Sequence, residues 1–449
     1  MAATRGEFSS RFGFIMAAAG SAVGLGNIWG FPTQAASNGG AAFLLVYILL
    51  AFLLAYPALM AEIILGRHAH ANAVHALAGT TDNPVLKRAG ATAGIVGFIV
   101  ASLILSFYAI VAGWMISNCL AALFRLLGQD PIATWLVGFS LSRNLIFMIL
   151  FMGLTIAIIS AGVRNGIERW SSRLMPILVV TMLALVAYVL TLDGALEGLR
   201  VYLMPDLSSV LSPTLIINAL GSAFFSLSLG VGTMLIYGSY IDDRENLPVA
   251  GGLVTLVDIG IAVLAGFLVL PSMYVALNNG VEIFSPSGSL LSEDTLIFTV
   301  LPELFASMGL AGGVVSFVFF FLMSIAALTS SISMLEVPVA YAIESRDVSR
   351  RSAVLIIGTA ISVISAVILF NFETLFGLVI TITTRYSQPV LGIVFCIYVG
   401  WLWRRDELLA ELKKGAPAIE QGIFWKLWPW HLRVVCPAII LIIFLQSIR

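Results

Sequence analysis

The stretch AGSAVGLGNIWGFP, residues 19–32, decides the fold of this chain. It lies in an apolar run long enough to cross a membrane, yet it holds four glycines, an asparagine and a proline. These residue types are poor helix formers. We therefore expect a transmembrane segment that is interrupted at Gly24, Leu25 and Gly26.

The composition is that of a membrane protein. Of the 449 residues, 60% are hydrophobic and only 10% are charged, and the mean hydropathy is +1.03. A soluble domain carries about 25% charged residues, whereas a helix needs about 20 apolar residues to cross the hydrocarbon. The sequence therefore predicts an all-α polytopic membrane protein, and its net charge of −1 gives no indication of nucleic-acid binding. Eleven candidate spans lie near residues 11–36, 40–66, 90–124, 142–161, 170–192, 213–240, 247–275, 311–344, 352–371, 374–403 and 432–448.

The distribution of basic residues predicts the orientation. With a cytoplasmic N-terminus, eighteen of the 23 lysines and arginines fall on the cytoplasmic side. An odd number of spans then places the C-terminus outside. No cleavable signal is expected, because the first apolar run is too long. The four basic residues on the outer side are Arg125, Arg143, Arg200 and Arg449.

The three cysteines all lie within candidate spans and show no metal-ligand spacing. Cys119, Cys396 and Cys436 are expected to be small packing residues, since free cysteine is often buried.

A second glycine-rich break corresponds to the first. Gly230, Val231 and Gly232 interrupt the sixth span, and each break opens a set of five spans. Corresponding interrupted spans in two halves indicate a transporter with a binding site near the midplane. The alternative is that the glycines only allow close helix packing. We expect two repeats, residues 1–212 and 213–403, followed by a cytoplasmic loop and an eleventh helix in residues 404–449.

Broken spans expose backbone groups that need partners, because an unpaired group in hydrocarbon costs several kcal/mol. A half-helix that begins after a break offers N–H groups and a positive dipole end to a carboxylate. We expect the N–H groups of Leu25 and Gly26 to hold an anion. The carbonyls of Gly20, Ala22 and Val23 are expected to hold cations, so a zwitterionic amino acid accompanied by sodium satisfies both ends.

The sequence resembles the neurotransmitter:sodium symporter family, which includes the bacterial leucine transporter. The resemblance covers almost the whole chain and implies a leucine-transporter-type 5+5 inverted repeat in a bacterial plasma membrane, with broken helices 1 and 6. Besides residues 19–32, it rests on Gly39-Gly40-Ala41-Ala42-Phe43, Glu62, Gly66-Arg67, Phe224-Phe225 and Leu328-Thr329-Ser330-Ser331.

The resemblance implies a first sodium site, in which Asp258 stands where the leucine transporter has asparagine. Independently, an acid inside a span costs about 2.5–3.5 kcal/mol and needs a partner. A salt bridge is the alternative, but spans 1, 6 and 7 offer no basic residue near Asp258. The implied ligands are the Ala22 carbonyl, Asn27, Ser226 and Asp258, together with the substrate carboxylate.

A second sodium site is implied between helices 1 and 8. Neutral oxygen ligands suit a hard cation. The alternative is that the hydroxyls of Thr329 and Ser330 bond to their own helix. The implied ligands are the carbonyls of Gly20, Val23 and Ala326 and the hydroxyls of Thr329 and Ser330.

Chloride is expected to be unnecessary. Chloride-dependent relatives place a chloride and a serine beside the first sodium site, and the leucine transporter places a glutamate where this chain has Ala262. Asp258 already supplies a fixed negative charge there.

The resemblance also implies a substrate pocket. Gly24 stands where monoamine transporters carry an acid, which favours an amino acid that brings its own carboxylate. The pocket is neutral and mostly apolar, which favours a neutral amino acid. Val231 replaces a phenylalanine of the leucine transporter and Met334 is an adaptable wall, so a side chain of leucine size or larger is expected. The carboxylate contacts are implied for Leu25, Gly26 and Tyr108, the ammonium contacts for Ala22, Phe225, Ser226 and Ser228, and the side-chain walls for Ile104, Phe225, Val231, Ser330 and Met334.

The outer gate departs from the family pattern. Most relatives place an arginine at the position of Gly30 and pair it with an aspartate in helix 10, where this chain has Ile380, or Val379 in a shifted register. Because both members of the usual ion pair are replaced, neither position leaves an unpaired charge. Arg385, about one turn further along, is expected to supply a displaced gate charge, or else to be a structural arginine hydrated by the vestibule.

On the cytoplasmic side, Arg5 is expected to pair with Glu344, with Phe8 and Tyr240 packed around the pair. Glu62 is expected to accept N–H groups from the unwound part of helix 6.

These residues predict a sodium-coupled symporter that imports a neutral, apolar amino acid by alternating access, and not an enzyme. A proton-coupled or exchange carrier of the same fold, and a sensor that binds an amino acid without transporting it, are the alternatives. The expected partners are the substrate, two sodium ions and membrane lipid. A monomer is expected to suffice, with a homodimer as the alternative, and no role follows for Glu336.

Overall fold

The computed structural model describes residues 6–204, 210–281, 283 and 301–448. In this part of the chain every regular element is helical. The helices are α1 Arg11–Ala22, α2 Phe31–Ser37, α3 Ala41–Leu50, α4 Tyr56–Ala69, α5 Ala73–Gly79, α6 Pro84–Leu126, α7 Asp130–Val137, α8 Leu141–Ser160, α9 Arg169–Val189, α10 Ala195–Leu203, α11 Pro213–Ser226, α12 Thr233–Gly238, α13 Leu247–Asn278, α15 Leu301–Ser307, α16 Gly309–Arg346, α17 Arg350–Phe370, α18 Phe372–Ile380, α19 Gln388–Ile397, α20 Arg405–Gly415 and α21 Ile423–Ile448.

The helices reproduce the expected spans with two broken segments. Nine helical stretches of the described residues are long and apolar enough to cross a membrane. The first segment adds a bent pair, Arg11–Ala22 and Gly26–Ser37, whose axes differ by 58°. The sixth is divided into α11 and the short α12. Helix α15 lies in the connection between α13 and α16, and residues 282 and 284–300 of that connection lie outside the described residues.

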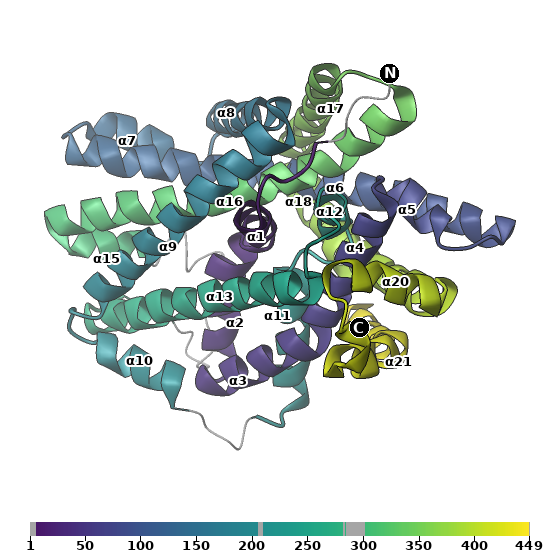
Figure 1. The fold of residues 1–449 in the computed structure, drawn as a ribbon. Helices are drawn as coiled ribbons and strands as arrows, with labels where there is room; N and C mark the ends of the chain where they lie inside the picture. The colour runs from purple at the N-terminus through teal and green to yellow at the C-terminus, as the bar shows by residue number, and fades with distance from the viewer. Residues whose placement is uncertain (1–5, 205–209, 282, 284–300, 449) are drawn as a thin grey trace.

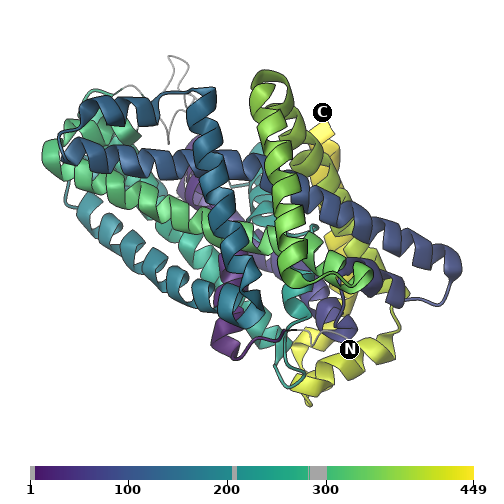
Figure 2. The same cartoon turned by 90° about the horizontal axis from the view of Figure 1, so that it is seen from above.

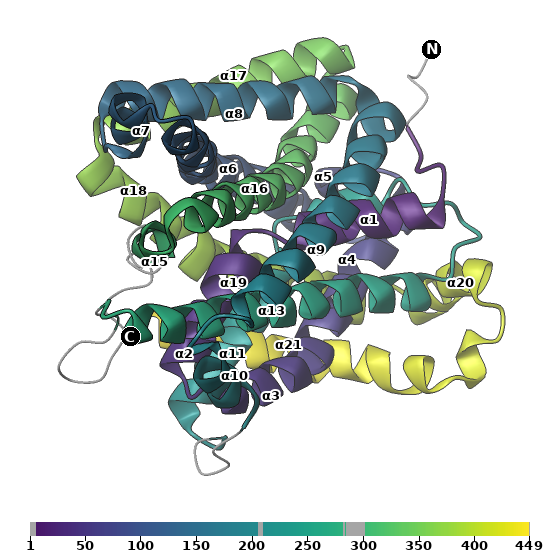
Figure 3. The ribbon, with the colours of Figure 1, turned by 90° about the vertical axis from the view of Figure 1, so that its left-hand side faces the viewer.

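Helix α1 lies at the centre of the bundle (Figure 1). It packs against α9, α13 and α16, and also against α12. Figures 2 and 3 show α20 and α21 along one edge, where both contact α4. In Figure 3, α20 and the N-terminus lie at one end of the bundle and α15 and α18 at the other. We call these the α20 end and the α15 end.

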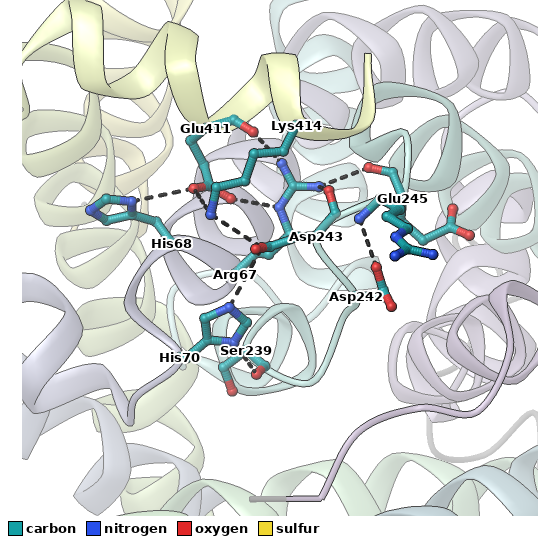
Figure 4. A network of polar contacts seen from close by, with 10 residues as sticks. Arg67, His68, His70, Ser239, Asp242, Asp243, Glu245, Glu411 and Lys414 are labelled. Carbon is teal, nitrogen blue, oxygen red and sulfur yellow. Dashed lines mark hydrogen bonds and ion pairs between the residues drawn. The ribbon is translucent and has the colours of Figure 1, made fainter. Parts of the chain in front are cut away.

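A buried ion pair holds α20 against the bundle (Figure 4). Arg67, near the end of α4, is fully buried, and its Nε lies 2.6 Å from Oε1 of Glu411. The same guanidinium donates to the carbonyl oxygens of Glu411, at 2.5 Å, and Glu245, at 2.7 Å. Lys414 bridges Glu411 and Asp243, at 2.9 and 3.1 Å. Helix α20 is therefore fastened both to α4 and to the loop that follows α12.

The surroundings of Glu411 keep its carboxylate charged. Burial alone raises the pKa of Glu411. Hydrogen bonds from His68, Lys414 and Arg67 outweigh burial and lower the pKa from 4.5 to about 2. A carboxylate with a lowered pKa stabilises the fold fully above the pKa of the unfolded chain, and the effect is lost as the pH falls through the folded value.

We expect Glu411→Gln to lower the free energy of unfolding by about 3–5 kcal/mol, because it leaves the buried Arg67 without its anion. Thermal unfolding of the purified protein in detergent measures this change. The difference from the wild type should persist at pH 5, since Glu411 titrates well below that pH.

Glu420→Gln is the matched control, because it breaks the exposed Lys413–Glu420 pair of the same segment. Exposed pairs contribute about 0–1 kcal/mol. Equal unfolding midpoints for the two variants would contradict a structural role of the buried pair.

Candidate functional site

At the break in the first segment, backbone N–H groups form hydrogen bonds with side chains. Helix α1 ends at Ala22, and the chain resumes as a π-helical turn, Gly26–Gly30, that leads into α2. The Gly24 N–H donates to Oδ1 of Asn27 at 3.2 Å, and the Leu25 N–H donates to the Tyr108 hydroxyl at 3.4 Å. The break lies within one residue of the predicted position.

The break in the sixth segment is longer than the sequence predicted. It runs from Leu227 to Gly232. Ser228, Gly230 and Gly232 all have positive φ, and the backbone of Gly230 lies so close to the Gln388 carbonyl that a Cβ would meet it at 2.4 Å. The Gly230 N–H donates to Oε1 of Glu62 at 2.7 Å. This is the contact expected of Glu62.

The two breaks face a common cavity of about 50 Å³. All eleven residues implied as substrate contacts line it, and Gly24, Phe107 and Gln388 line it as well. A Cβ on Gly24 would come within 2.7 Å of the Ser330 hydroxyl and 2.9 Å of the Tyr108 hydroxyl, so the pocket is tight at this point. The expected set is Ala22, Leu25, Gly26, Ile104, Tyr108, Phe225, Ser226, Ser228, Val231, Ser330 and Met334.

A buried oxygen cluster adjoins this pocket. Asp258 on α13 accepts hydrogen bonds from Asn27 Nδ2 and from the Ser226 hydroxyl, both at 2.7 Å. Tyr47, which sequence reasoning missed, donates to Ser226 at 3.3 Å. No ion pair to Asp258 is found among the described residues. A carboxylate, hydroxyls and an amide without a basic neighbour suit a hard cation.

The orientation of Asn27 decides how it would hold such an ion. Its Nδ2 faces Asp258 and Ser226, whereas its Oδ1 faces the Gly24 N–H. Amide nitrogen and oxygen have the same shape, so there is room to turn the amide over. Without an ion, the turned amide would set Oδ1 against the Asp258 carboxylate and Nδ2 against the Gly24 N–H. A cation in the cluster requires the turned orientation, with Oδ1 toward Asp258.

Helix α16 brings hydroxyls to the carbonyls of α1. Ser330 donates to the Val23 carbonyl at 3.0 Å and to the Gly20 carbonyl at 3.4 Å. Thr329 lies against Gly20 but donates to Ile325 and Ala326 of its own helix. The five residues implied for the second sodium site are thus neighbours, and the Thr329 hydroxyl would have to rotate to serve as a ligand.

A larger cavity of about 530 Å³ continues from the pocket toward Arg385 and the end of α21. The two cavities share Gly26 and Phe225, and the Phe225 side chain is 43% exposed. We call the larger cavity the vestibule. Gly30 and Arg385 line it, whereas Ile380 is not among its described lining residues. A Cβ on Gly30 would meet no atom within 4 Å.

The opposite end of the pocket is closed by packed and paired side chains. Phe8 packs edge-on against Tyr240 and donates its N–H to the Tyr240 carbonyl at 3.0 Å. The Tyr240 hydroxyl donates to Glu336 at 2.6 Å, and Arg350 holds the same carboxylate with two hydrogen bonds, at 2.6 and 3.0 Å. Glu336 thus has a partner on α17 that the sequence did not reveal.

The start of α1 is fastened on its other side as well. Glu168 accepts hydrogen bonds from the Ser9 N–H, the Ser9 hydroxyl and the Ser10 hydroxyl, at 2.7–3.1 Å. Gly13 makes this possible, because a Cβ there would lie 1.9 Å from the carboxylate. The expected Arg5–Glu344 pair includes a residue outside the described part of the chain, and Glu344 accepts hydrogen bonds from Asn72.

Comparison with known proteins agrees with this geometry. The model of the sodium:neurotransmitter symporter family matches residues 5–131 and 138–449. The chain belongs to this family. It is therefore a multi-pass membrane protein with the fold of that family. Its family membership also makes it a sodium-coupled transporter.

Relatives from distant organisms share the resemblance. The uncharacterized sodium-dependent transporter YhdH of Bacillus subtilis is 34% identical to this chain. The alignment covers 98% of this chain and 97% of YhdH. The bovine sodium-dependent neutral amino acid transporter B(0)AT2 is 24% identical over 59% of this chain and 40% of its own. Among solved structures, MhsT in complex with L-phenylalanine superposes with a TM-score of 0.83 and 36% identity, covering 99% of this chain and all of MhsT.

We expect Asp258→Asn to raise the sodium concentration for half-maximal substrate binding by tenfold or more, because it removes the fixed charge of the oxygen cluster. The measurement is a sodium titration of substrate binding to purified protein.

The control for this variant is Thr255→Val, one turn earlier on α13. The Thr255 hydroxyl bonds only within its own helix, to the Gly251 carbonyl. An unchanged sodium requirement in Asp258→Asn would show that the cluster does not hold the ion.

Proposed function

We propose that this protein is a sodium-coupled symporter that imports a neutral amino acid with a mostly apolar side chain, without a need for chloride. One observation carries the proposal: Ser226 lines the pocket between the two broken helices and also donates to Asp258 in the buried oxygen cluster. An amino-acid carboxylate at the helix 1 break would therefore lie beside a cation held by Asp258. Substrate and sodium would stabilise each other's binding.

The pocket supports an amino acid rather than an amine. The N–H groups of Leu25 and Gly26 lie at the N-terminus of a half-helix. The positive end of the helix dipole there would stabilise a bound carboxylate. The Tyr108 hydroxyl adjoins Leu25 and completes an anion site. Apolar walls of Ile104, Val231 and Met334 favour a neutral side chain.

The relatives support the same class of substrate. MhsT was solved with L-phenylalanine, and B(0)AT2 is described as a neutral amino acid transporter. Coupling to sodium is supported by the bacterial relatives, which are described as sodium-dependent transporters.

The two ends of the pocket support alternating access. In the described conformation the pocket adjoins the vestibule at Gly26 and Phe225, which line both, whereas Phe8, Tyr240 and Glu336 pack together at the α20 end. We place the α20 end in the cytoplasm of a bacterium, as the basic residues indicate. Tyr240 and the pair Arg5 and Glu344 would open for release inward, and Arg385 would be the vestibule charge.

The direct test is uptake by proteoliposomes across a panel of neutral, acidic and basic amino acids. We expect an inward sodium gradient to drive accumulation of neutral amino acids, and replacement of chloride by gluconate to leave the rate unchanged. Asp258 supplies the negative charge that chloride would otherwise provide. Uptake of every substrate at equal rate without sodium would contradict the proposal, and so would binding without flux.

Gly30 offers a test of the vestibule. We expect Gly30→Arg to reduce uptake several-fold, because it adds a second cation beside Arg385 without an acid to pair with it. Ile380→Asp added to this variant should restore uptake. Gly30→Ala should transport normally, since a Cβ there has free space. If the double variant stays impaired, the gate does not depend on a charge pair at these positions.

A further inference from the structure

Gln388 is a polar residue of the pocket that the proposed function has not used. It is the first residue of α19, directly after the π-helical stretch Thr381–Ser387. Its side chain is 2% exposed, and the residue lines the central pocket. No contact implied by the resemblance falls on it.

The amide oxygen of Gln388 is buried and accepts no hydrogen bond from the described residues. The other polar side chains of the pocket are engaged: Ser226 with Asp258, Ser228 with the Ser21 carbonyl, and Ser330 with the carbonyls of α1. A buried acceptor without a donor costs about 1–3 kcal/mol. Such a group needs a partner that the described residues do not supply, and at a binding pocket a bound substrate can supply it.

The position of Gln388 shows which part of a substrate it would meet. Its backbone carbonyl abuts Gly230, next to Val231, which lines the pocket with Met334. The N–H groups proposed for the carboxylate belong instead to helix 1, at Leu25 and Gly26. Gln388 thus lines the pocket together with Ile104, Val231 and Met334, the apolar residues that would surround the substrate side chain.

We propose that Gln388 selects substrates whose side chain carries an N–H or O–H donor, which would bond to its Oε1. This inference rests on the proposed function and narrows its substrate class to neutral amino acids with a largely apolar body and one donor, as in tyrosine or tryptophan. A site built to bond a donor rejects an analogue that lacks it, because the buried acceptor is then left unpaired.

Near-isosteric pairs of amino acids test this inference: tyrosine with phenylalanine, threonine with valine, and glutamine with methionine. Sodium-driven uptake of both members is measured on the same proteoliposomes. We expect the wild type to favour the donor-bearing member by about five-fold or more in kcat/KM, the effect of one hydrogen bond. Gln388→Met, which keeps the length of the side chain, should bring the ratio close to one while apolar members are still transported.

The ratio separates specificity from folding, because a poorly folded variant loses both members of a pair alike. If Gln388→Met shows no uptake at all, the wild-type ratios decide: a preference below two-fold in all three pairs would overturn the inference, as expected if water alone satisfies the amide. A preference that survives in a transporting Gln388→Met would overturn it too. Absence of sodium-driven uptake for the whole panel would instead overturn the proposed function, and this inference with it.

Discussion

Backbone polar groups that leave a helix inside a membrane must find other partners, and the rest of this structure depends on how two helices meet that demand. At the first break, Asn27 and Tyr108 take up single N–H groups of Gly24 and Leu25. At the second, Glu62 takes up the N–H of Gly230. These contacts give the freed N–H groups partners and leave a cavity between the two breaks.

The two breaks also explain why acids occur so deep in an apolar bundle. Glu62 and Asp258 are both fully enclosed, yet each accepts hydrogen bonds from groups at a break. Glu62 supports the shape of helix 6, since it bonds to backbone. Asp258 bonds to the side chains of Asn27 and Ser226, which can turn toward an ion. A buried carboxylate therefore stabilises the backbone at one break, and at the other it joins two polar side chains in a cluster that has no ion-paired basic partner among the described residues.

Local composition made the spans and both breaks predictable, because glycine runs and hydropathy act over a few residues. The pocket residues followed only from the resemblance to the family. The start of the second break at Leu227 was not predictable, because the positive φ of Ser228 reflects its contact with Ser21 on α1. Ion pairs between different helices were equally unpredictable from the sequence. Nothing near Glu336 in sequence indicates Arg350, and nothing near Arg67 indicates Glu411, 344 residues away. Such pairs exist only once the bundle is assembled.

The two ends of the pocket differ in how they are held. At the α20 end, buried ion pairs, Arg350–Glu336 and Arg67–Glu411, fix the elements around the closure. The described lining of the vestibule contains Arg385 but no acid to pair with it. A ligand shifts a conformational equilibrium only by its differential affinity for the two states. The described lining offers no ion pair that would favour closure of the vestibule. In the proposed transport cycle, the free energy of that closure would therefore come from apolar packing around Phe225 and from the substrate in the pocket.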